Sequence, residues 1–240
     1  MLLPLNAAYK FVAIAFMLSE VNNFTDNVGL NGNSPISLSD VVTGSHVGPV
    51  NSTNFSGSIL TEKYFFGFWK GHLANYYKRG FMPDSNEGIQ RRNIELSRLS
   101  SLVDSNGAFQ LATNWISQIG LNLPLLESKY ARSIIQWKYY HQGSNTTPVL
   151  LPVYQIEWTG VLEQVKSKRI RPIVAVTVFG ARKELVEYHV LDDALFLRPR
   201  IEIRNVEKLL SIEDRSFQVF SLLEKSNLLS EFVVDQTPGI

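Results

Sequence analysis

The side chains best suited to acid–base chemistry or metal binding are few and widely separated in this sequence. The histidines are His46, His72, His141 and His189, and none forms a His-x-x-x-His or comparable metal-ligand spacing. Cysteine is absent, which excludes disulfides, thiol nucleophiles and zinc–thiolate sites. We therefore predict no metal site and no cofactor, and no residue type or spacing singles out a catalytic residue.

Motifs for nucleophilic or phosphate chemistry are also missing. There is no Gly-x-Ser-x-Gly elbow, no Gly-x-x-x-x-Gly-Lys loop and no Gly-x-Gly-x-x-Gly after a strand. Carboxylates such as Glu157 and the Asp192-Asp193 pair are scattered, and a glycosidase-like pair would have to converge in three dimensions. An enzyme, with an acidic residue or histidine in a pocket between helix and sheet, is therefore the less favoured interpretation.

Aromatic residues at alternate strand positions are the best candidates for binding. Exposed on a sheet, such rings stack against sugars or grip an extended peptide; the alternative is that they pack under the helices of a small domain. The candidate binding residues are Trp69, Trp137, Tyr139, Tyr154, Ile156 and Trp158.

Two helices and two sets of strands would position these rings. Residues 5–28 carry apolar side chains at three- and four-residue steps, which indicates a helix, and a similar stripe predicts a second helix over about 105–120 with Trp115 in the core. Alternating aromatics around Lys70-Gly71 predict a hairpin within 60–79. Residues 80–106 lose this periodicity and predict a loop. Further strands are expected near 133–141, 149–158, 172–179 and 184–191, and a last helix over 213–232.

The two predicted helices end in a similar sequence. Asn23 to Asn31 reads NFTDNVGLN, and Asn114 to Asn122 reads NWISQIGLN. The shared glycine suits the left-handed position that ends a helix. The repeat predicts an α+β chain of two tandem units, each a helix followed by an antiparallel sheet. The predicted boundaries are 1–85 for the first unit, 86–104 for a linker, 105–195 for the second unit and 196–240 for a C-terminal extension with a helix.

One strand offers a docking edge. Pro148 and Pro152 lack backbone donors, so the strand over 149–158 is expected at a sheet edge rather than at its centre. Such an edge accepts an added strand from a peptide or protein partner, or from a second copy of the chain, unless the prolines block the pairing.

Charge and hydropathy argue against two other classes of partner. With 23 basic and 22 acidic residues the net charge is +1, so no overall field draws nucleic acid to the chain. The apolar run from Phe11 to Leu18 is too short to span a bilayer. It also lacks a preceding basic region and a following cleavage site, so we interpret it as a core helix rather than a signal peptide.

Several segments resemble a known group of proteins. The helix over 106–116, Leu151-Pro152-Val153-Tyr154, the stretch from Val174 to Leu185 and Arg198-Pro199 are similar to uncharacterised, mostly exported proteins of Verrucomicrobia and related bacteria. The order of helix and sheet also resembles PepSY and cystatin-like modules, some of which bind peptides or inhibit peptidases. These resemblances imply an exported, non-catalytic module that binds or regulates peptide or protein. The alternatives are the enzyme above and carbohydrate binding through exposed aromatics.

Overall fold

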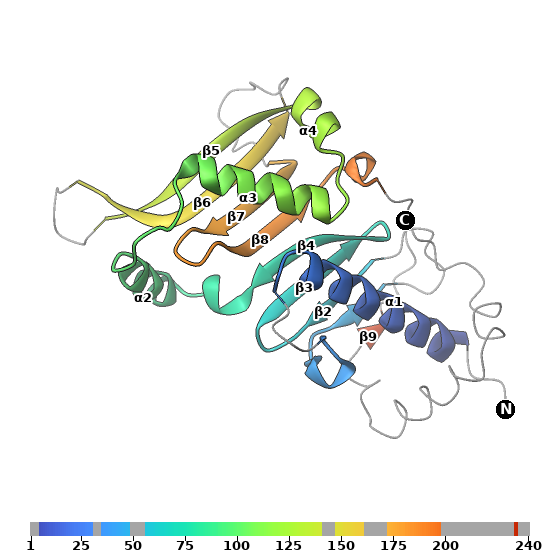
Figure 1. Cartoon of the computed structure of the whole chain (residues 1–240). Coiled ribbons are helices and arrows are strands. Elements are labelled where there is room, and N and C mark those ends of the chain that lie inside the picture. The colour runs from blue at the N-terminus through green and yellow to red at the C-terminus, as the bar shows by residue number, and fades with distance from the viewer. Residues whose placement is uncertain are drawn as a thin grey trace. The chain divides into compact units, whose positions relative to one another are not determined.

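A computed structural model describes residues 5–30, 35–48, 56–140, 147–160, 172–197 and 233–234, and for 5–12 and 233–234 the backbone alone. These residues form helices and antiparallel sheet, as the α+β prediction requires (Figure 1). The chain divides into two compact units, the first comprising Met1–Ala74 with Pro199–Ile240 and the second Asn75–Arg198. The helix predicted over 213–232 lies outside the described residues, as does His141.

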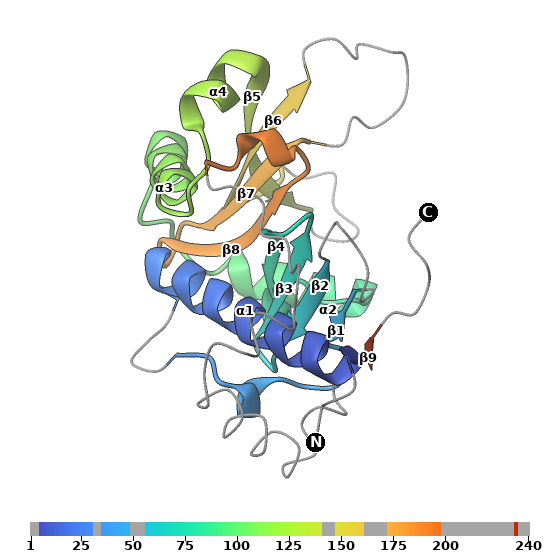
Figure 2. The same ribbon diagram turned by 90° about the vertical axis from the view of Figure 1, so that its right-hand side faces the viewer.

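In the first unit, α1 covers one face of a small sheet with strand order β3-β2-β1-β9 (Figure 2). The strands are antiparallel except β9, which runs parallel to β1. The elements are α1 (Leu5–Asn27), η1 (Leu38–Asp40), β1 (His46–Val47), β2 (Gly57–Leu60), β3 (Tyr64–Trp69), the start of β4 (His72–Lys78) and β9 (Val233–Val234).

The buried residues of α1 recur at helical spacing and face the sheet. The rings of Phe16 and Phe24 meet those of Phe68 and Phe66 of β3 edge-to-face, with centroids 6.2 Å apart in both pairs. The side chains buried on this face are Ala13, Ile14, Met17, Val21, Phe24 and Val28. The predicted helix is therefore confirmed.

The second unit is a five-stranded antiparallel sheet, order β5-β6-β7-β8-β4, with α3 lying across one face (Figure 1). Its elements are the end of β4, η2 (Arg79–Phe81), α2 (Asn86–Leu96), α3 (Ser105–Gln118), α4 (Leu123–Lys129), β5 (Tyr130–Tyr139), β6 (Val149–Gly160), β7 (Val174–Phe179), β8 (Glu184–Val190) and η3 (Asp193–Leu195). The four strands predicted here are confirmed, and every residue of the central strand β7 is buried.

One local prediction needs correction. Residues 86–96, expected to be a loop, form α2, which begins where the Ser85 side chain accepts a hydrogen bond from the Gly88 N–H. Helix α3 is capped by Asp104, whose carboxylate accepts from the Gly107 N–H at 2.8 Å. The hairpin prediction is correct, with Lys70 and Gly71 at φ of 50° and 78° in its turn.

The repeated sequence forms the same helix end in both units. Leu30 N–H donates to Thr25 C=O at 2.8 Å, and Leu121 N–H donates to Ile116 C=O at 3.0 Å. These bonds close a Schellman cap around Gly29 and Gly120, whose φ angles are +71° and +84°. The two helix ends therefore match bond for bond in the register that the sequence predicts.

The predicted edge position of β6 is wrong. This strand pairs with β5 on one side and β7 on the other. Gly180 N–H donates to Pro152 C=O at 2.7 Å, and the return bond that a proline cannot make is replaced by Leu102 N–H, which donates to Gly180 C=O at 3.0 Å. A donor from the loop after α2 thus lets a proline occupy an internal strand.

Candidate binding surface of the second unit

Three of the candidate binding residues belong to the core. Tyr154, Ile156 and Trp158 alternate toward the face of the sheet that α3 and α4 cover, and their exposures are 4%, 0% and 0%. The indole N–H of Trp158 is satisfied by the Glu127 carboxylate of α4 at 2.8 Å. As the structure stands, these side chains support the sheet and do not present a surface. Trp115, predicted as core, is buried on α3.

Trp69 lies in the first unit, whereas the other five candidates lie in the second. It ends β3 half-buried, and the Lys70 ammonium lies 4.5 Å from its ring centroid. The six predicted residues thus belong to two different units, and three of those in the second unit are core.

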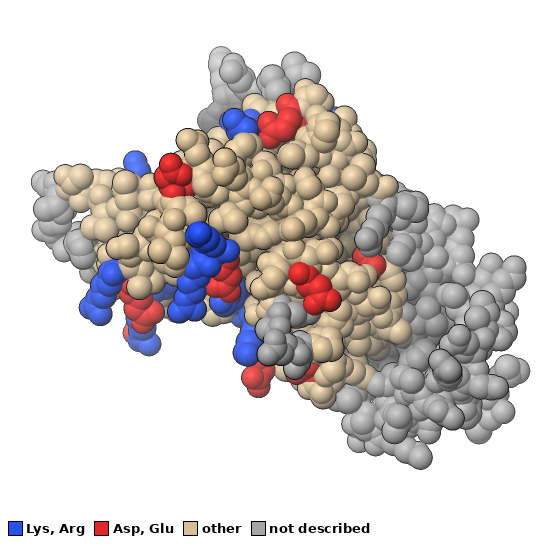
Figure 3. Space-filling view, viewed as in Figure 1, with Lys and Arg blue, Asp and Glu red and all other residues tan. Residues whose placement is uncertain are grey.

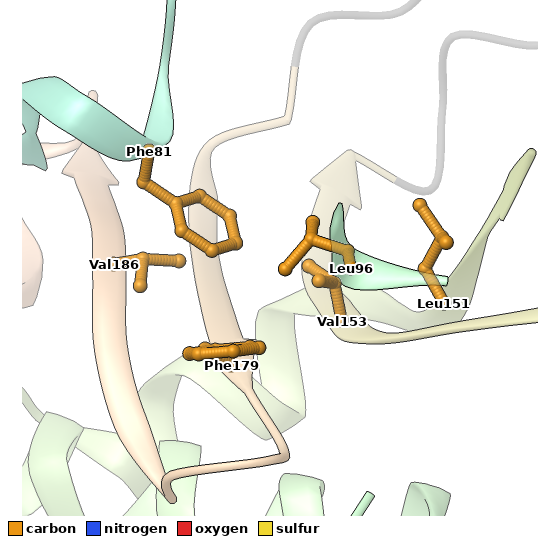
Figure 4. Packing of buried hydrophobic residues seen from close by; sticks show 6 residues of the cluster. All are labelled: Phe81, Leu96, Leu151, Val153, Phe179 and Val186. Atoms are coloured by element: carbon orange, nitrogen blue, oxygen red, sulfur yellow. The ribbon is translucent and has the colours of Figure 1, made fainter. Parts of the chain in front are cut away.

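Trp137 and Tyr139 pack on the other face of the second unit's sheet, against a cluster of buried apolar side chains (Figure 4). The Phe81 ring lies 6.0 Å from that of Trp137 and 5.4 Å from that of Phe179. We call Phe81, Trp137 and Phe179 the aromatic cluster. The members of the buried cluster are Phe81, Leu96, Leu151, Val153, Phe179 and Val186.

Arg92 of α2 lies over this aromatic cluster. Its guanidinium carbon is 4.9 Å from the Trp137 ring centroid and 5.8 Å from that of Phe81. One N–H donates to the Phe81 carbonyl at 2.8 Å, and two share the Asn93 side-chain oxygen at 2.9 and 3.2 Å. Burial lowers the pKa of Arg92. All these acceptors are neutral, so within the described part of the chain this half-buried cation has no carboxylate partner.

A second guanidinium lies near the Phe179 ring of the cluster. Arg182, in the turn between β7 and β8, lies 6.0 Å from the Phe179 ring centroid and is exposed. Figure 3 shows basic side chains around α2 and this turn, with acidic side chains between them. Glu87 of α2 pairs with Arg91, and Glu184 of β8 pairs with Lys78. Glu157 and Glu187 on the same face of the sheet hydrogen-bond only to neutral groups, so the charges around the aromatic cluster are mixed.

Strand β5 ends the sheet next to this cluster. Successive residues of an antiparallel strand point their backbone groups to opposite neighbours. Trp158 C=O and Pro152 C=O accept bonds from the β7 side, so Glu157 and Gln155 point to β5 and pair with Ser133 and Ile135. The backbone groups of Arg132, Ile134 and Gln136 therefore point outward, and no strand among the described residues pairs with them.

The other ionisable groups on this face of the sheet are engaged in separate pairs. Glu157 accepts from the Gln155 amide at 2.7 Å, and Glu187 accepts from the Thr177 hydroxyl at 2.9 Å. His189 contacts the Pro172 carbonyl through Nε2 at 3.2 Å. No group of three or more His, Cys, Asp or Glu residues that could hold a metal ion occurs among the residues described here.

Asp192 joins α4 to the end of the sheet. Its carboxylate accepts from the Lys129 ammonium at 2.7 Å, from the Tyr130 hydroxyl and from the Ala194 N–H. Burial raises the pKa of Asp192, but these three hydrogen bonds outweigh it and the net shift is downward. Burial also raises the pKa of Tyr130, and the bond to Asp192 adds to the effect. Each polar group here satisfies another, so the cluster has a structural role.

The residues that sequence reasoning missed are Arg92 and Phe81. Both fall within 80–106. Pro83, Asp84 and Gly88 are typical of a loop, so the sequence did not predict the short helix that carries the arginine. The available signal was Ser85 three residues before Gly88, a helix cap spacing. Nothing in the sequence marks Phe81 as a partner of Trp137.

Comparison of the chain with known protein families, curated proteins and solved structures found no match. No helix in the described ranges has the length and apolar character needed to cross a membrane.

Proposed function

We propose that the protein is a non-catalytic module that binds an extended segment of a peptide or protein by adding it to β5. The observation that carries the proposal is the outward row of backbone groups at Arg132, Ile134 and Gln136. A peptide in extended conformation hydrogen-bonds to such a row, and its alternate side chains then select the sequence.

The surface beside this edge supports the same function. Ile135 is 46% exposed on β5, and Tyr140 and Leu150 beyond it are 61% and 55% exposed. Ile135 shares with the half-buried Trp137 and Tyr139 the face that carries the aromatic cluster, and these three give an added strand apolar contacts there. Leu150 pairs with Lys138 and therefore lies on the opposite face. The sequence predicted strand addition at 149–158, and we now propose it at the neighbouring strand, β5.

The test is an array of random ten-residue peptides probed with the full chain. Peptides that bind are then measured against Ile134→Pro, which removes an outward N–H while leaving the inward bonds of Ser133 and Ile135 to β6 intact. We expect the affinity for these peptides to fall at least about tenfold. The proline removes one N–H donor and bends the strand, and the backbone hydrogen bonds to the peptide need a straight strand with all its donors.

The matched control is Ile134→Val, which keeps the N–H and should bind as the parent does. Equal binding by the proline variant, or an array on which no peptide binds, would contradict the proposal. Sedimentation velocity of the unliganded chain tests the other occupant of this edge: dimers abolished by Ile134→Pro would identify a second copy, not a foreign segment.

The larger architecture is part of the proposal. The matching caps at Gly29 and Gly120 support two tandem helix-then-sheet units, and the PepSY or cystatin-like character of those units and the export of the protein remain predictions. Superposition of residues 18–31 on 109–122 in an experimental structure, continued through the strands that follow, tests the tandem arrangement.

A further inference from the structure

We infer that Arg92 recognises a carboxylate on the segment that adds to β5, so that the partner is an acidic extended peptide. The inference rests on the proposed function, because it names the chemistry of the segment that this edge receives.

The hydrogen bonds of Arg92 leave its charge uncompensated. A guanidinium carries five N–H groups. The Phe81 carbonyl and the Asn93 side-chain oxygen occupy three, and the Met82 sulfur lies 3.9 Å from Nη1. One N–H of Nη2 has no acceptor among the contacts of this arginine. A cation partly removed from water without an opposite charge is unfavourable, and an arriving carboxylate relieves that cost.

The position of Arg92 suits a ligand on β5. Its guanidinium lies 4.9 Å from the ring of Trp137, which is itself a residue of β5. An added strand lies roughly 4.8 Å from β5. The Trp137 indole N–H donates to the Gln155 side-chain oxygen of β6 at 3.1 Å, so the ring leans toward β6. The contact that this inference assigns is a Glu or Asp on the added strand, on the same face as Trp137, that reaches the arginine across this ring.

The charges nearby are mixed. Arg98 after α2 is exposed and forms no ion pair among the described contacts, and Arg182 lies 6.0 Å from the Phe179 ring centroid. Glu157 and Glu187 lie on the same face of the sheet and hydrogen-bond to neutral groups. A charge-assisted bond at Arg92 supplies specificity, while the exposed cations add a weaker attraction that salt screens.

The experiment uses pairs of ten-residue peptides of alternating valine and threonine with one internal Glu or, in the matched peptide, Gln. Affinity is measured with the full chain, and the Trp137 indole N–H is followed by NMR. We expect the Glu peptide to bind about tenfold more tightly than the Gln peptide at one position, with the Trp137 resonance shifted. In Arg92→Gln this preference should disappear while the Gln peptide keeps its affinity.

Two further variants separate recognition from folding. Arg91→Gln removes the neighbouring exposed arginine, which pairs with Glu87, and should keep the preference. Arg92→Lys keeps the charge and the aliphatic stem but not the planar fork, so the preference should fall several-fold and persist. Equal binding of Glu and Gln peptides to the parent chain overturns this inference and leaves strand addition standing. Binding of neither peptide overturns both.

Discussion

Helices α1 and α3 end in the same way, yet the units that contain them differ in how much apolar surface they expose. Each helix closes in a Schellman cap around a glycine and buries an aromatic residue one turn earlier, Phe24 in the first unit and Trp115 in the second. Among the described residues, however, all eight large apolar side chains that are exposed lie in the second unit. The repeat thus governs how a helix is seated on its sheet, whereas α2 and β5 give the second unit a surface of its own.

The largest expected effect tests whether the two helix seats are equivalent. Phe24→Ala and Trp115→Ala should each lower the free energy of unfolding by roughly 3–5 kcal/mol, because each empties a large buried site. Urea denaturation monitored by circular dichroism measures both. Ser19→Ala and Ser117→Ala, at exposed positions of the same helices, should change it by less than about 0.5 kcal/mol. A large loss in one unit and almost none in the other would break the comparison.

A second prediction concerns a contact within the second unit, where the loop after α2 packs against the sheet at Gly180. A Cβ added at Gly180 would overlap the Ser101 hydroxyl and lie 2.9 Å from the Tyr154 ring. Gly180→Ala should therefore destabilise the chain by roughly 1–3 kcal/mol, as overpacking does. Gly160→Ala, where a Cβ meets nothing within 4 Å, is the control and should be close to neutral. Equal thermal shifts for the two variants would show that the loop yields freely.

A smaller effect sharpens the comparison at the caps themselves. Gly29→Ala and Gly120→Ala meet no atom within 4 Å, so their cost comes only from the left-handed backbone. That cost is about 1–2 kcal/mol, and it should be the same in both units. Asn at either position should recover part of the loss, since asparagine tolerates this conformation. Unequal losses, measured by denaturant titration, would argue against equivalent caps.

The smallest effect belongs to the second unit alone and depends on pH. The folded-state pKa of Asp192 is below its value in the unfolded chain, near 3.9. Its stabilisation is therefore fully present above that pH and is lost as pH falls through the folded-state pKa. Asp192→Asn should melt at a lower temperature than the parent at pH 7, and the two should converge as pH falls through the folded-state pKa of Asp192. A gap that persists in acid would show that the carboxylate charge is not the cause.

Sequence periodicity predicted much of the fold because most elements bury a regular stripe. The buried stripe of α3 and the continuous apolar run of β7, which is buried on both faces, are clear in the sequence. The sequence did not predict helix α2, because only Leu96 is buried on it and its first turn contains glycine and asparagine. Its stability comes from tertiary packing that no local window contains.

The candidate site was only partly predictable for a related reason. Alternation on a strand tells which side chains share a face, and Trp137 and Tyr139 do lie together. It cannot tell which face a helix covers, so Tyr154 and Trp158 turned out to be core. The proline rule failed for β6 because the replacement donor, Leu102, lies far away in the sequence.

At Leu102, the replacement donor, side-chain exposure and protection of the backbone amide do not go together, although they usually do. The Leu102 side chain is 65% exposed, yet its amide hydrogen lies within the ladder between two internal strands. Hydrogen–deuterium exchange should therefore be slow at Leu102, on the timescale of the β7 amides, and fast at its loop neighbours. The exchange rate at this single position reports how often the loop lifts from the sheet, independently of any change in the strands themselves.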